Sequence, residues 1–170
     1  IGIYPVVDTG TKGDDRFQNT SQATYTFDSS NNRVTTSYTI TDKALTDSNA
    51  VDEDGNNLLD ENGNQVINYG LKHFAKETAK LQAHGLIKRF GWLVQRVTMD
   101  NSKTIPSAVI TYCANIRTDC ANIITAIDNA SNMTAFKALH QDTYNSDGSV
   151  DVVARVNRWS DDTNVQQYVR

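Results

Sequence analysis

Residues 106–130 read PSAVITYCANIRTDCANIITAIDNA, and this stretch decides the fold of the second half of the chain. Apolar side chains recur in it at alternating spacings of four and three residues, the repeat that places them on one face of a helix. Pro106 suits the first position of such a helix. A helix of this length with an apolar stripe must pack against another helix. We therefore predict a helix-packing seam made of Val109, Cys113, Ile116, Cys120, Ile123 and Ile127.

A second helix is predicted over residues 69–90, where apolar or small residues again recur three and four apart. Its packing face would consist of Leu71, Phe74, Ala75, Thr78, Leu81, Gly85 and Leu86, with lysines on the opposite face. The connection from Trp92 to Pro106 joins this helix to the seam helix, which predicts an antiparallel helical hairpin. A shorter helical piece is expected at residues 134–140.

The first part of the chain has the alternation of a β-hairpin. Ala23, Tyr25 and Phe27 alternate with polar residues, and so do Val34, Thr36, Tyr38 and Ile40 after a turn rich in Ser and Asn. This period of two, with β-branched and aromatic residues on one face, is typical of paired strands. A single hairpin is not stable alone, so its apolar face must cover another surface.

A small internal repeat occupies residues 52–67. DEDGNNLL at 52–59 is followed by DENGNQVI at 60–67, and each copy is an acidic Gly turn that leads into two apolar residues. The oxygen-bearing side chains also suggest a calcium loop, but the spacing differs from that of an EF-hand: counted from Asp52, Gly55 stands at position four and Gly63 at position twelve. We therefore interpret the repeat as two turns and predict no metal site.

These patterns predict an α+β protein: a β-hairpin-containing, turn-rich module at 1–67, a helical hairpin or small bundle at 68–145, and a C-terminal strand or arm at 146–170. Val150, Val152, Ala154 and Val156 alternate in part along that last segment, which also carries Trp159. An extended arm with exposed aromatics would be a docking element.

Composition argues against several classes of function. The net charge is −4 over 170 residues, and no Lys/Arg cluster is visible, so we expect no nucleic-acid binding. The apolar runs are too short to span a membrane, so no membrane partner is expected. The start, IGIYPVVDTG, has neither the basic nor the apolar region of a signal peptide.

No pattern of a catalytic or metal site is present, and we predict a non-enzymatic protein with no catalytic residue and no cofactor. His73, His84 and His140 stand in no zinc-ligand spacing, and no nucleophile elbow, phosphate loop or dinucleotide fingerprint occurs. Cys113 and Cys120 are seven residues apart, about 10 Å along a helix, too far for a mutual disulfide. A serine triad is recognised only in space, so a small hydrolase stays the weakest alternative.

The order of these features resembles proteins of tailed bacteriophages, especially marine phages and cyanophages. The resemblance spans about residues 1–130. In the first half it lies in Tyr4–Asp8, in the stretch from Tyr38 to Leu45, and in the helix start Gly70–Lys72. In the helical part it lies in Trp92, Arg96, Pro106, Tyr112 and the Ile116-Arg117 pair. Gly91 and Cys113 depart from that pattern, where the phage segments have Asp and Arg.

This resemblance implies a structural, tail- or virion-associated protein that is assembled in the host cytoplasm into the virion. Its partners would be further copies of itself, as a homo-oligomer, and other virion proteins. The candidate interface aromatics are Tyr25, Phe27, Tyr38, Trp92 and Trp159. Two alternatives stay open: a receptor-binding fibre module that recognises a host glycan through such aromatics, and a tail assembly chaperone.

Overall fold

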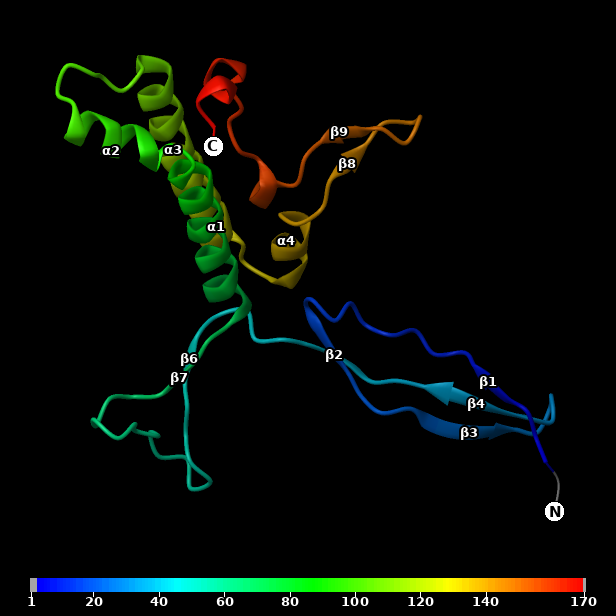
Figure 1. Cartoon of the computed structure of the whole chain (residues 1–170). Coiled ribbons are helices and arrows are strands. Elements are labelled where there is room, and N and C mark those ends of the chain that lie inside the picture. Colours follow the sequence, from blue (N-terminus) through cyan, green and yellow to red (C-terminus); the bar gives the residue numbers. More distant parts are fainter. Residues whose placement is uncertain (1–2, 170) are drawn as a thin grey trace. The chain divides into compact units, whose positions relative to one another are not determined.

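The computed structural model describes residues 3–169, and its strands and helices confirm the α+β class (Figure 1). The chain divides into two units, Ile1–Leu45 and Thr46–Arg170. This division falls earlier than the boundary predicted after residue 67. The reason is local: the Gly70 amide donates to Asp47 Oδ1 at 2.8 Å, so the turn-rich loops begin and end on the first helix.

The first unit contains two small sheets. Its strands are β1 (Val6–Asp8), β2 (Gln18–Thr20), β3 (Thr24–Asp28), β4 (Arg33–Ser37) and β5 (Ile40–Asp42). In the sheet of order β1-β4-β3, β3 and β4 form the predicted hairpin, and β1 adds to β4 in parallel. The end of the predicted hairpin differs, because Ile40 has left β4 and lies in β5, which pairs with β2.

A buried hydroxyl fastens β1 to β4. Thr36 is a polar residue that is buried in this unit, and its Oγ1 donates to Asp8 Oδ1 at 2.6 Å. The Tyr38 hydroxyl donates to the other carboxylate oxygen at 3.2 Å. The Thr36 hydroxyl and the Gly10 amide hold the pKa of Asp8 below its usual value. The ionised Asp8 carboxylate thus accepts hydrogen bonds from β4 and from Tyr38 beside the parallel pairing.

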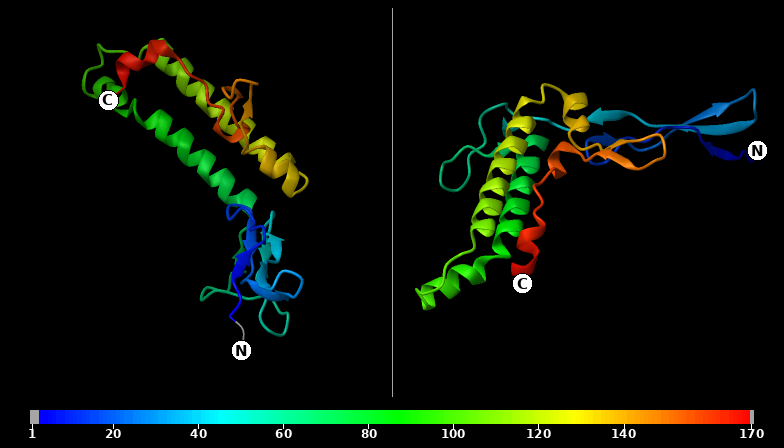
Figure 2. Two further views of the ribbon diagram at one scale, coloured as in Figure 1. Left: turned by 90° about the vertical axis from the view of Figure 1, so that its right-hand side faces the viewer. Right: turned by 90° about the horizontal axis from the view of Figure 1, so that it is seen from above.

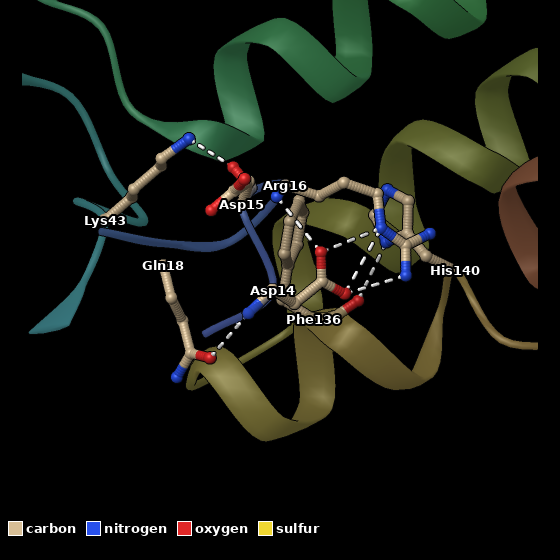
Figure 3. Close-up of polar contacts among 7 residues, drawn as sticks. All are labelled: Asp14, Asp15, Arg16, Gln18, Lys43, Phe136 and His140. Atoms are coloured by element: carbon tan, nitrogen blue, oxygen red, sulfur yellow. Dashed lines mark hydrogen bonds and ion pairs between the residues drawn. The ribbon is translucent and has the colours of Figure 1, made fainter. Parts of the chain in front are cut away.

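The turn before β2 is closed by side chains (Figure 3). The Arg16 guanidinium pairs with the Asp14 carboxylate at 2.8 Å, and the Asp14 amide donates to Gln18 Oε1 at 3.3 Å. Lys43, just after β5, donates to the carbonyl of Asp15. These contacts tie the start of β2 and the end of β5, which pair at Gln18↔Asp42, to one loop.

The second unit is built on an antiparallel helix pair (Figures 1 and 2). Its helices are α1 (Leu71–Lys88), α2 (Gly91–Met99), α3 (Ser107–Asn129) and α4 (Met133–Ala138). Lys72 and Lys76 near the start of α1 both reach Asp128 near the end of α3, at 2.9 Å. At the other end, Arg89 donates to the Tyr112 hydroxyl at 3.2 Å. α2 was not predicted as a separate helix; the chain bends at Phe90 and continues helically from Gly91.

The packing face of α1 differs from the predicted one. The buried residues of α1 are Ala79 and Ala83, whose small side chains bring the two helix backbones close together. Phe74 and Leu81, which the apolar period placed in the packing face of this helix, are 57% and 71% exposed. The period of three and four was correct for a helix, but the face it selected is only partly covered: Phe74 and Leu81 are exposed, whereas Leu86 packs against the core that contains α3 residues.

The C-terminal segment is not a free arm. β9 (Val150–Val152) pairs with β8 (Thr143–Tyr144), and two short 3-10 helices follow, η1 (Arg155–Asn157) and η2 (Thr163–Tyr168). Val165 in η2 is 1% exposed and belongs to the same core as α3. The Ser160 amide donates to Asp119 Oδ2 at 2.7 Å. Burial of Val165 thus returns the end of the chain to the helix pair.

Candidate interaction surfaces

The predicted seam residues lie in the interior of the second unit. Val109, Cys113, Ile116, Ile123 and Ile127 are buried, and Cys120 is half-buried. Burial raises the pKa of the Cys113 and Cys120 thiols, and both cysteines are free. A buried thiol with a raised pKa is a poor nucleophile, so these cysteines serve as apolar packing residues.

Two predicted aromatics, Tyr25 and Phe27, form an exposed face on the first unit. They alternate along β3 and are 65% and 48% exposed. Tyr4 joins them, with its ring centroid 4.7 Å from that of Phe27. Tyr38 is half-buried instead: it lies close to Gly10, where an added Cβ would come within 2.5 Å of the ring.

The two tryptophans are occupied by contacts within the second unit. Trp92 Nε1 donates to the backbone oxygen of Tyr168 at 2.9 Å. Trp159 is half-buried and packs against the same core as Trp92. Both side chains hold the C-terminal segment on the helices, which explains why the segment folds back.

The internal repeat forms a loop module, residues 48–68, in which two closed loops and one strand pair meet at a set of backbone hydrogen bonds. The Leu58 amide donates to Ala50 O, the Val66 amide to Leu58 O and the Ala50 amide to Val66 O, at 2.8–2.9 Å. Three residues at intervals of eight thus close a ring of hydrogen bonds. The two closed loops carry the bridges Val51↔Asn57 and Leu59↔Gln65. The strand pair consists of β6 (Ser48–Asn49) and β7 (Ile67–Asn68), and it leads into α1.

An aspartate and a glycine set the conformation of each of the two closed loops. Asp52 Oδ1 accepts from the Asn56 amide and Asp60 Oδ1 from the Asn64 amide, both at 2.8 Å. These backbone bonds hold the pKa of Asp52 and of Asp60 below the usual value. Gly55 and Gly63 sit at φ +82° and +79°, in the left-handed region that side-chain-bearing residues avoid.

The outer surface of this module combines carboxylates with aliphatic side chains. Residues 51–66 contain five acidic residues and no basic one: Asp52, Glu53, Asp54, Asp60 and Glu61. Val51 and Leu59 are each 55% exposed, and Leu58 is 44% exposed. Their exposure makes these three side chains available for contact with another surface.

A groove lies at the other end of α1, where it meets α2 and the start of α3. Its volume is about 280 Å³, and its walls are mainly apolar. The wall residues are Ile87, Phe90, Gly91, Val94, Ile105, Val109, Ile110 and Cys113, with Lys88 and Arg117 at the charged positions. Val94 and Ile110 are more than half exposed. Within residues 3–169, the side chains of Lys88 and Arg117 have no ion-pair or hydrogen-bond partner.

The sequence signals for these surfaces were weak. The repeat marked the loop module, but its exposed Leu58 and Leu59 looked like strand residues. The groove combines three separate segments, so no local pattern could reveal it. Among the described residues, no group of three or more His, Cys, Asp or Glu side chains could hold a metal ion. Across the same part of the chain, no helix combines the length and apolarity of a membrane span.

Comparison with known proteins gives no relative from which a role could be transferred. No protein-family model matches the chain, and neither a curated protein nor a solved structure matches it.

Proposed function

We propose that this chain is a non-enzymatic building block of a tailed-phage virion, which acts by docking to further copies of itself and to other virion proteins. The phage assignment rests on the resemblance in residues 1–130. The docking mechanism rests on the surfaces described above.

The observation that carries the docking role is the set of large apolar side chains left exposed on helices and on the loop module. Phe74 and Leu81 on α1 are more than half exposed, and so are Val51 and Leu59 on the loop module. Burial of apolar surface drives most protein association, at about 25 cal/mol per Å². In a multi-copy particle, several such contacts act together, so each one can be weak.

A receptor-binding role is the second candidate, and one observation favours it. Tyr4, Tyr25 and Phe27 form an exposed aromatic face on the first unit. Aromatic rings on a rigid sheet can stack against the apolar face of a sugar ring. This candidate predicts that glycans of the host surface raise the melting temperature of the protein, and that a Tyr25→Ser variant loses the effect.

Immunogold labelling of gradient-purified particles from the source culture tests the proposal. Antibodies to the chain should place gold at one defined location on the particle, such as the neck, the tail or the capsid surface. Unlabelled particles, with abundant protein in the infected lysate, would contradict a structural role and favour an assembly chaperone. Antibodies preabsorbed with the purified chain provide the control.

A further inference from the structure

We infer that the loop module (residues 48–68) of one copy docks into the α1–α2–α3 groove of a second copy, in a head-to-tail contact. The inference rests on the proposed function, because it names the partner and the surfaces through which copies would assemble.

The two surfaces are chemically complementary. The groove offers apolar walls and two unpaired cations, Lys88 and Arg117. The loops offer exposed aliphatic side chains beside carboxylates. Glu53 and Glu61 are exposed, and neither side chain has an ion-pair or hydrogen-bond partner within the described chain. Leu58 or Leu59 would enter the groove, and the glutamates would lie against Lys88 and Arg117.

The groove is large enough for such a guest. A cavity of roughly 150 Å³ can hold a benzene molecule, so a groove of about 280 Å³ accommodates an aliphatic side chain. The partly exposed walls at Val94 and Ile110 would lose contact with water when the side chain enters. Charge pairs at the edge of an apolar contact mainly fix its orientation and its partner.

The contact cannot form within one copy. The loop module precedes Leu71 at the start of α1, whereas the groove uses Ile87 and Lys88 at its end (Figure 1). The 18 residues of α1 separate the two surfaces by about 27 Å at ~1.5 Å per residue. Two different surfaces that meet between copies form a heterologous contact, which repeats into a closed ring or a filament.

A charge-swap experiment tests the pairing in the full-length chain by analytical ultracentrifugation. The groove variant is Lys88→Glu with Arg117→Glu, and the loop variant is Glu53→Lys with Glu61→Lys. Each should weaken self-association by about 10-fold or more, because like charges then face each other. The four substitutions combined should restore most of the affinity, because the pairs are opposite again. Lys12→Glu with Lys103→Glu repeats the charge change of the groove variant on other surfaces and should leave association unchanged.

Every outcome bears on the contact. Restored association in the combined variant supports it. A combined variant as weak as the two separate ones would overturn it, and so would a wild-type chain that stays monomeric up to millimolar concentration. Gold-labelled particles together with such a monomer would retain the structural role and reject only this contact, so the two proposals can fail separately.

Discussion

Replacement of Ile116 by alanine should destabilise the second unit strongly. Ile116 is 0% exposed at the centre of α3. The substitution removes three buried carbons, which costs about 2.4 kcal/mol at ~0.8 kcal/mol per buried methylene. The residual cavity adds to this transfer cost, and the sum is about 3–4 kcal/mol. Leu81→Ala is the matched control, since it removes the same number of carbons from a side chain that is 71% exposed. Its expected cost is within about 0.5 kcal/mol of zero.

Urea unfolding followed by circular dichroism at the helix band measures this difference, because α1, α2, α3 and α4 belong to the second unit. With a slope of about 2 kcal/mol per M, the midpoint of Ile116→Ala should fall by roughly 1.5–2 M relative to the control. Equal midpoints for the two variants would refute the packing of α1 on α3 described here. The measurement should be made at low protein concentration, so that association between copies does not contribute.

Three further predictions concern the second unit. Gly70→Ala should lower the free energy of unfolding by about 1–3 kcal/mol, because the new Cβ would lie 2.5 Å from the carbonyl carbon of Thr46. Gly85→Ala should raise the free energy of unfolding by about 0.5–1 kcal/mol, because the new Cβ has open space around it. Equal effects of the Gly70 and Gly85 substitutions in urea unfolding would contradict the close contact of Gly70 with Thr46. The pKa of Asp52 and of Asp60 is lowered in the folded state by hydrogen bonds from the Asn56 and Asn64 amides. These hydrogen bonds therefore stabilise the loops above about pH 4, and the stabilisation is lost as the pH falls through the folded pKa. Those amide resonances should therefore shift only below pH 4 in an NMR titration, and a transition above pH 4 would disprove the bonds. Trp92→Phe removes the donor to Tyr168 O and should cost about 1 kcal/mol, with faster hydrogen exchange in η2; unchanged exchange there would show that η2 does not depend on this bond.

The sequence was most informative where a local pattern controls the structure. The spacing of Val109, Ile116 and Ile123 indicated a buried helix face, and these residues are buried in α3. The alternation around Tyr25 and Phe27 indicated a hairpin, which is present as β3–β4. In both segments the period of the side chains and the period of the backbone agree, so a short window of sequence is enough.

Tertiary packing decided the features that the sequence left open. On α1, Phe74 and Leu81 gave the stronger apolar signal, yet the helix buries Ala79 and Ala83, since small side chains allow a close approach to α3. The end of the chain folds back because Val165 reaches a core formed by residues far away in sequence. The hydrogen-bond ring of Ala50, Leu58 and Val66 is likewise a property of three segments together.

Quantitative mass spectrometry of gradient-purified particles is the most direct test of the structural role. If the chain is a virion building block, its peptides should band with the particles at a fixed ratio to the major capsid protein, and the ratio should survive repeated purification. A ratio that falls towards zero with each gradient, while the chain persists in the lysate, would contradict the account.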